Sequence, residues 1–264
     1  MKNARTETPG TGGKQVIELI DVYKSFGEQK VLNGVNLNIP DKKVVTIMGK
    51  SGCGKSVLIK HIIGLLTPEK GSVLIDGVDI TGLDVTELDR IREKLGVLFQ
   101  GGALFDSLTV YGNVAFLLRE KTKMSRGEIR DRVIQALEDV GLKGMGKKYP
   151  AELSGGMKKR AGLARALIAE PSIVLFDEPT TGLDPIISRS IHRLIRATHE
   201  KYQYAAVIIS HEVPGIFEIS DKVAMLYNGR IEEYGTPEEI LNSSNPVIKQ
   251  FITGSLEGPI ESLS

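Results

Sequence analysis

A glycine-rich loop at residues 49–56, GKSGCGKS, limits the folds open to this chain more than any other segment. It fits the pattern G-x-x-x-x-G-K-[ST], whose glycines let successive backbone N–H groups turn inward around phosphate oxygens. The loop follows a strand expected at 43–48 and precedes an apolar run, VLIKHIIGLL, that suits a helix packed on a sheet. This order of strand, loop and helix predicts a nucleotide site in an α/β fold.

Each position of the loop has an expected role. Lys55 is placed for the β- and γ-phosphates, and Ser56 is placed for Mg²⁺. Lys50 and Cys53 fill variable positions, and their side chains are expected to point away from the phosphates. The residues predicted to bind nucleotide are Gly49, Lys50, Ser51, Gly52, Cys53, Gly54, Lys55 and Ser56.

Two adjacent carboxylates follow a second expected strand. The apolar run at 173–176 leads directly into Asp177 and Glu178, and open α/β sheets bind ligands at the carboxyl ends of their strands. Asp177 is expected to face the Mg²⁺ shell, and Glu178 is expected to polarise the attacking water as a general base. A solvated strand end is the alternative for such a pair alone, but the phosphate loop favours a catalytic role.

The remaining pattern predicts a parallel sheet with a helical insertion, because strands alternate with helices. Ser125 is expected to begin a helix, with Glu128 completing a capping box. Strands are expected at 16–19, 31–39, 172–176 and 205–210, hairpins at 73–80 and 223–235, and helices at 88–95, 110–119, 126–142 and 186–202.

These expectations divide the chain into three parts. A flexible, polar tail is expected at 1–14, a single domain at 15–245 and a C-terminal extension at 246–264. A helical subdomain at about 88–165 is inserted in the domain. In the extension, Val247, Ile248, Phe251 and Ile252 have helix-like spacing and are expected to pack on the same domain, with contact to a second subunit or a regulatory partner as the alternative.

Composition narrows the classes of function. The chain has 34 basic and 33 acidic residues, so binding to nucleic acid or to an anionic membrane would have to be local. Apolar runs such as 173–176 and 205–209 are strand-sized, whereas a membrane-spanning helix needs about 20 residues. A single cysteine, Cys53, excludes an intramolecular disulfide. Work at a membrane would therefore depend on other chains.

Further motifs follow in a recognisable order. Gln100 lies in LFQGG, LSGGM occupies 153–157, TGLD occupies 181–184, and His211 follows a strand. With the phosphate loop and the carboxylate pair, this order resembles the nucleotide-binding domain of ABC transporters over about residues 16–240. The resemblance implies a P-loop NTPase (RecA-like) parallel-sheet core with an antiparallel β region and a helical signature subdomain. It also implies ATP and Mg²⁺ as cofactors and ATP hydrolysis as the activity.

The resemblance implies a role for each matching residue. Tyr23, in VYKSFG, resembles the aromatic residue that stacks on adenine, with a core tyrosine as the alternative. Gln100 resembles the residue that touches Mg²⁺ and the nucleophilic water. Asp184 resembles the aspartate that communicates across a dimer, and His211 resembles the switch histidine at the γ-phosphate.

The LSGGM segment implies a second copy of the chain. In the family, two subunits pack head to tail around two ATP molecules. Ser154 and the backbone N–H groups of Gly155 and Gly156 would face the γ-phosphate of ATP on the other subunit. Met157 stands where most ABC signatures have glutamine. This departure resembles the lipid-transport branch, and a tolerated filler at a helix start is the alternative.

The run FQGGALFDSLTVYGNVAFLLRE, with LSGGM and KKRAGLARAL, resembles the ATPases of MCE-domain lipid transporters, the Mla type. This implies integral-membrane permease subunits, an MCE-domain lipid-binding protein and a small regulatory subunit as partners, without nucleic acid. It places the chain on the cytoplasmic face of the bacterial inner membrane. The permease's coupling helix is expected in the groove around Gln100 and the helical lobe, the subdomain at about 88–165. Gly112 replaces an acidic residue of many relatives.

Three alternatives stay open. The chain could serve an importer of a small polar solute. It could be an ABC protein of DNA repair or translation, although it has no long coiled-coil insertion, second nucleotide domain or basic stripe. It could also bind ATP without turnover, which the presence of Glu178 and His211 opposes.

Overall fold

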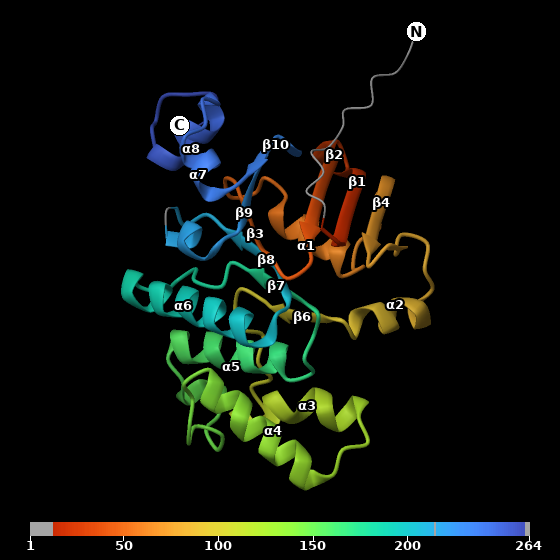
Figure 1. Cartoon of the computed structure of the whole chain (residues 1–264), viewed down its shortest axis with the longest axis vertical. Helices are drawn as coiled ribbons and strands as arrows, with labels where there is room; N and C mark the ends of the chain where they lie inside the picture. Colours follow the sequence, from red (N-terminus) through yellow and green to blue (C-terminus); the bar gives the residue numbers. More distant parts are fainter. Residues whose placement is uncertain (1–12, 214, 262–264) are drawn as a thin grey trace.

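Two sheets organise the chain in the computed structural model, which describes residues 13–213 and 215–261 (Figure 1). The antiparallel sheet has the order β2-β1-β4-β5, with β1 (Gln15–Phe26), β2 (Gln29–Pro40), β4 (Lys70–Ile75) and β5 (Val78–Asp79). The second sheet has the order β10-β9-β3-β8-β7-β6, with β3 (Val44–Met48), β6 (Leu95–Leu98), β7 (Ile173–Asp177), β8 (Ala205–Ser210), β9 (Lys222–Tyr227) and β10 (Arg230–Gly235). Of the predicted tail at 1–14, residues 1–12 lie outside the described part of the chain.

The second sheet is parallel except for its last pair, β9 and β10. Every residue of β3 and β8 is buried, because side chains cover both faces of this sheet. Along β3, Val45 and Ile47 join the core shared with α1 and the antiparallel sheet, whereas Val44 and Met48 join the core shared with the helices. The predicted parallel sheet with an antiparallel β region is therefore present.

Helices cover the parallel sheet and extend beyond it. Figure 1 shows α3, α4 and α5 grouped at the end of the molecule opposite to the antiparallel sheet. Ser125 begins α4, and the predicted capping box with Glu128 is present. The helical elements are α1 (Lys55–Ile62), α2 (Val85–Arg92), α3 (Val110–Lys121), α4 (Arg126–Asp139), η1 (Pro150–Glu152), α5 (Gly155–Leu167), α6 (Pro185–Tyr202), η2 (Gly215–Ile219), α7 (Pro237–Leu241) and α8 (Pro246–Thr253).

The helix predicted at 88–95 is wrong at both ends. The helix begins earlier, because Asp84 and Glu87 form a capping box that starts α2. It ends at Arg92, and the next residues form β6, which pairs with β7 at the edge of the parallel sheet. The predicted start of the helical subdomain at about 88 is therefore too early, since β6 belongs to the core sheet.

The C-terminal extension packs on the same domain, as predicted. Val247 and Ile248 of α8 are buried in the core that underlies the helices, and Phe251 and Ile252 pack against it. The chain after α8 folds back, because the Gln250 side chain donates to Ile260 O at 3.0 Å and accepts from Ile260 N at 2.6 Å. None of the helices in the two described ranges combines the length and apolar character that crossing a membrane requires.

Candidate active site

The phosphate loop leaves the end of β3 and leads into α1. Gly49, Gly52 and Gly54 have φ values of 155°, 78° and 104°, which side-chain-bearing residues rarely adopt. Space is also restricted, because a Cβ at Gly49 would lie 2.4 Å from the carbonyl oxygen of Leu226. The glycines therefore allow the loop to adopt its conformation. The loop amide groups lie at the N-terminus of α1, which is the positive end of the helix dipole.

Lys55 lies inside the loop that precedes it. Its buried Nζ donates to the carbonyl oxygens of Gly49 and Lys50 at 2.8 and 2.9 Å. A hollow of about 270 Å³ lies beside the loop, lined by Phe26, Gln29, Val31, Ser51, Gly52, Gly54, Lys55, Ser56, Val57 and Glu178. Cys53 faces the core that includes α1, where burial raises the pKa of its thiol. Lys50 is exposed outside the hollow.

The aromatic residue at this hollow is Phe26, and the structure does not bring Tyr23 to it. Phe26 is 48% exposed at the end of β1. The Tyr23 side chain lies against the neighbouring strand, where a Cβ at Gly34 would lie 2.8 Å from its hydroxyl oxygen. Stacking on a base bound by the loop is therefore a role that the geometry favours for Phe26.

Two side chains with oxygen atoms, a hydroxyl and a carboxylate, meet beside the loop. Ser56 Oγ donates to Asp177 Oδ1 at 3.2 Å, which joins the start of α1 to the end of β7. Burial raises the pKa of the Asp177 carboxyl, the hydrogen bond from Ser56 lowers it, and the Glu178 charge raises it further. A hydroxyl and a half-buried carboxylate next to phosphate-binding amides fit Mg²⁺, because this ion prefers oxygen ligands. A cation bound there would favour the charged form of the Asp177 carboxylate.

Glu178 is the centre of a second group of polar side chains. Its carboxylate accepts from Gln100 Nε2 at 3.3 Å and from Thr181 Oγ1 at 3.0 Å, and His211 Nδ1 lies 3.4 Å from it. Glu178 also has a φ of 49°, a left-handed conformation that costs a residue with a side chain about 1–3 kcal/mol. The structure thus brings together Gln100, Glu178 and His211, which lie far apart in the sequence.

The start of α5 is a different kind of helix start. Ser154 Oγ accepts from Met157 N at 3.3 Å, and Ser154 and Gly155 are exposed. A Cβ at Gly156 would lie 2.7 Å from Ile187 Cγ2, so this glycine permits close packing on α6. The described residues that line the hollow at the phosphate loop include none from this helix start. Met157 is half-buried against the core, which favours the filler interpretation of its side chain.

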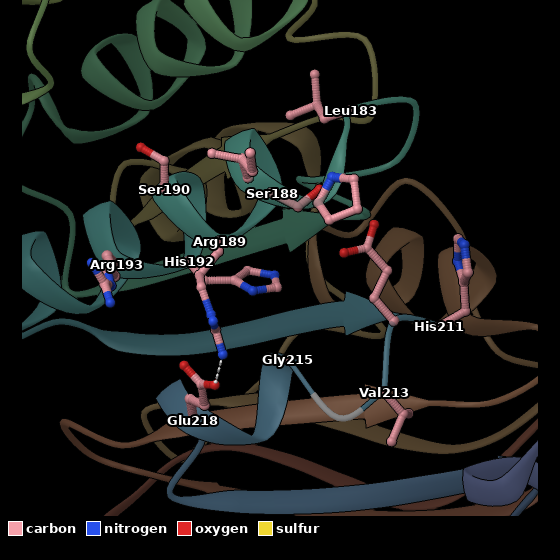
Figure 2. A pocket seen from close by; sticks show the side chains of 13 residues that line it. Leu183, Ser188, Arg189, Ser190, His192, Arg193, His211, Val213, Gly215 and Glu218 are labelled. Atoms are coloured by element: carbon pink, nitrogen blue, oxygen red, sulfur yellow. Dashed lines mark hydrogen bonds and ion pairs between the residues drawn. The ribbon is translucent and has the colours of Figure 1, made fainter.

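Asp184 caps α6, since its Oδ1 accepts from the backbone N–H groups of Ile186 and Ile187, both at 3.0 Å. A hollow of about 840 Å³ lies beside this cap and extends to His211. Figure 2 shows that Arg189 of α6 reaches across this hollow to Glu218 of η2, and the two side chains form an ion pair of 2.6 Å. This hollow therefore lies next to the start of α6, which Asp184 caps, and next to the loop that carries His211.

Sequence reasoning missed three residues of the site: Phe26, Thr181 and Lys159. Lys159 of α5 is 5% exposed, and its Nζ donates to the backbone carbonyls of Gln100 and, at 3.3 Å, Glu178. The basic run KKR gave no signal for this, because charge runs on helices usually face solvent. The second aromatic of VYKSFG and the first residue of TGLD were visible signals for the other two.

A phosphate loop before α1, a carboxylate pair after β7 and an LSGG helix start between them define an ATP-hydrolysing P-loop cassette. Residues 32–181 match the family model described as ABC transporter, and the chain belongs to this family. The predicted P-loop NTPase fold and ATPase activity are thereby confirmed.

Two relatives and one solved structure illustrate the similarity. The chain is 46% identical over 244 residues to "Probable ribonucleotide transport ATP-binding protein mkl" of Mycobacterium leprae, covering 92% of this chain and 70% of that one. It is 39% identical over 247 residues to "Intermembrane phospholipid transport system ATP-binding protein MlaF" of Haemophilus influenzae, covering 94% of each. The structure titled "Dimeric structure of a post-hydrolysis state of the ATP-binding cassette MJ0796 bound to ADP and Pi" is similar with a TM-score of 0.77 and 34% identity, over 84% of this chain and 98% of that chain.

Proposed function

We propose that this ABC ATPase closes head to tail on a second copy of itself around two ATP molecules and thereby drives a separate bacterial membrane permease. The observation that carries the proposal is the separation of its two glycine-rich helix starts. The loop before α1 lies beside Asp177 and Glu178, whereas the start of α5 packs on α6 and is not among the described residues lining that hollow. A second copy would bring the missing helix start to each ATP.

The residues of one chain then divide the chemistry among them. Lys55 and the loop amides bind the β- and γ-phosphates, while Ser56, Asp177 and Gln100 would hold Mg²⁺. Mg²⁺ bound there would neutralise charge on the phosphates. Glu178 accepts the proton of the attacking water, and His211 contacts the γ-phosphate. The two hydrogen bonds from Gln100 and Thr181 to the Glu178 carboxylate, with His211 3.4 Å from it, support this role, because they fix its direction.

The start of α6 supports a contact between two copies. Ile186 is 81% exposed there, next to the Asp184 cap and beside the hollow that Figure 2 shows. A partner that covers this hollow would remove the Ile186 side chain from water, which is favourable for an aliphatic group. When the second copy approaches, Asp184 would then transmit this contact to α6 and to the His211 loop of the same chain.

For the cargo, we propose phospholipid moved between envelope membranes by an Mla-type system. The support is the similarity to MlaF, whose name states intermembrane phospholipid transport, over 94% of both chains. Such a system would add an MCE-domain lipid-binding protein and a small regulatory subunit, on the cytoplasmic face of the inner membrane. Transport of a small polar solute is the second candidate, because the relative with 46% identity is named for ribonucleotide transport.

The helical lobe carries a hollow suited to a permease helix. It measures about 570 Å³ and is lined by Thr109, Tyr111, Ile134, Leu137, Glu138, Lys143, Gly144, Gly146, Lys147 and Tyr149. Gln100 does not line it, so the permease would bear on Gln100 through the lobe. Gly112 is buried, and a Cβ there would lie 3.3 Å from the Leu108 Cβ, so any side chain at this position would make a tight contact with Leu108.

The substitution Glu178→Gln tests the catalytic assignment. Without the carboxylate, the attacking water loses its base, and we expect ATP hydrolysis to fall by about 10²–10⁴-fold while ATP binding persists. Size-exclusion chromatography with ATP should then show a trapped dimer. Equal hydrolysis rates for the wild type and the variant would reject Glu178 as the base, and a variant that stays monomeric with ATP would reject the dimer.

Purification of the intact complex from membranes tests the cargo. Mass spectrometry should identify a permease, an MCE-domain protein and bound phospholipid. Recovery of the permease with a binding protein for a nucleoside or another small solute would instead establish the second candidate.

A further inference from the structure

Lys159 is a buried cation that lies between the α5 helix and the segments that carry Gln100 and Glu178. It belongs to α5, the helix that begins at Ser154, and it is 5% exposed. Burial of an ammonium group is costly unless polar groups compensate it. Its Nζ donates to the backbone oxygens of Gln100 and Glu178, so it joins α5 to both segments that carry the proposed hydrolytic side chains.

The charges around Lys159 suit this place. Burial lowers the pKa of its ammonium, whereas the carboxylates of Glu178, Asp177 and Glu212 act in the opposite direction. A neutral side chain of similar length would fill the same volume without these interactions. The lysine therefore supplies charge and hydrogen bonds at a site that packing alone does not require to be basic.

Helix α5 contacts the loop at residues 100–103, the Gln100 loop, at more than one point. Arg165 Nη2 donates to Gly102 O at 3.1 Å, and Nη1 donates to Ala103 O at 2.5 Å. Gly162 permits close contact, because a Cβ there would lie 3.1 Å from Gly102 O. Since α5 contacts three successive parts of this loop, a shift of the helix must move the loop with it.

The Glu178 backbone has fewer contacts with α5 than the Gln100 loop has. Its N–H donates to Ile209 O at 3.1 Å, and its carbonyl accepts from Lys159 Nζ at 3.3 Å and from Thr181 N at 3.4 Å. These bonds hold the peptide groups on both sides of a residue whose φ is 49°. Because the carboxylate direction follows from that backbone conformation, Lys159 contacts the part of Glu178 that aims its side chain.

We propose that Lys159 is a positioning residue that couples the seating of the α5 start on a partner's ATP to the placement of Gln100 and Glu178 in its own chain. The coupling rests on the proposed head-to-tail dimer, in which the α5 start meets that ATP. Lys159 does not touch the nucleotide. It acts through two backbone carbonyls, so the rate of hydrolysis depends on it while the binding of ATP to the loop of the same chain does not.

The full-length chain offers a matched pair of variants. Lys159→Met keeps a similar length but removes the charge and the donors, and Lys159→Arg keeps both. Arg160→Met is the control, because Arg160 is the next residue of α5 and donates to Val140 O and Ser190 Oγ at 3.1 and 2.8 Å, away from Gln100 and Glu178. The measurements are kcat and KM for ATP, binding of trinitrophenyl-ATP, and the melting temperature.

We expect Lys159→Met to lower kcat by about 100-fold, the size of loss that a small misplacement of catalytic groups causes. KM and trinitrophenyl-ATP affinity should stay within about twofold of the wild type, and Lys159→Arg should recover most of the lost rate. Arg160→Met should lower the melting temperature by about as much as Lys159→Met does, but it should leave kcat within about twofold of the wild type.

Equal kcat values for Lys159→Met and Arg160→Met would overturn the proposal, because Lys159 would then only stabilise the fold. If Lys159→Met does not fold, Lys159→Gln is compared with Arg160→Gln by the same criterion. Failure of the dimer is distinguishable: if Glu178→Gln stays monomeric with ATP in size-exclusion chromatography, the head-to-tail dimer is rejected, and with it the coupling across two copies. The kcat comparison uses other variants, so it rejects Lys159 separately.

Discussion

Two helices of this protein, α1 and α5, begin at glycine-rich turns, and the glycines serve different purposes. Gly54, before α1, has a φ of 104° and offers no side chain as a cap. Ser154, before α5, has ordinary extended angles of −66° and 163°, and its hydroxyl caps the helix. The two glycines after Ser154 instead allow close packing, because Cβ atoms there would lie 3.2 Å from Leu183 and 2.7 Å from Ile187.

This difference separates binding from coupling. The shape of the α1 loop depends on its own backbone and on Lys55, which bonds to two of its carbonyls. The place of the α5 start depends on α6, on the Asp184 cap and, through Lys159, on the catalytic segments. Changes near the α1 loop should therefore alter the affinity of a single chain for ATP, whereas changes at the α5 start should alter turnover.

Among changes made directly at the two helix starts, Gly156→Ala should have the largest effect. The added methyl group would press on Ile187 and displace the α5 start, and overpacking of this kind costs about 1–3 kcal/mol. We expect hydrolysis to fall by about 30-fold, equivalent to about 2 kcal/mol, with single-chain ATP affinity nearly unchanged. Steady-state hydrolysis and equilibrium titration with ATP measure the two quantities.

The double variant Gly156→Ala/Ile187→Ala is the control. Removing the Ile187 side chain makes room for the new methyl group, so part of the lost hydrolysis should return. A double variant that is as slow as Gly156→Ala alone would show that the glycine is needed for its backbone and not for packing on α6.

A smaller effect is expected from Phe26→Ala on the α1 side. Stacking of a base on an aromatic ring contributes about 1–3 kcal/mol, so single-chain ATP affinity should fall by about tenfold. Calorimetric titration measures this affinity. Tyr23→Phe should bind ATP as the wild type does, and a loss confined to Tyr23→Ala would restore the assignment made from the sequence.

The case of Tyr23 and Phe26 shows where sequence reasoning succeeded and failed. The phosphate loop and the carboxylate pair were predictable, because each is a local pattern at the end of a strand. In VYKSFG, alternation could not tell which aromatic faces the site, since the pairing of β1 with β2 shifts register around Tyr23 and again between Lys24 and Ser25.

Tertiary packing decided the other differences. The four residues of β6 are too few for a clear period, and they form a strand only because β7 provides a neighbour. The inward direction of Lys159 depends on α5 lying against the Gln100 loop, a contact between segments 59 residues apart. Neither feature has a local signal in the sequence.

The smallest effect distinguishes a cap from a ligand at the start of α5. Ser154→Ala removes a helix cap, and Thr109→Ala removes the equivalent cap of α3, where Thr109 Oγ1 accepts from Gly112 N at 3.1 Å. Each change should lower the free energy of unfolding by about 1 kcal/mol, measured by urea denaturation. If Ser154 also bonds to ATP on a second copy, Ser154→Ala alone should slow hydrolysis by about fivefold, the value of one hydrogen bond. Equal hydrolysis by the two variants would mean that Ser154 only caps the helix, and the grip on the partner's ATP would then belong to the glycine amides and the α5 dipole.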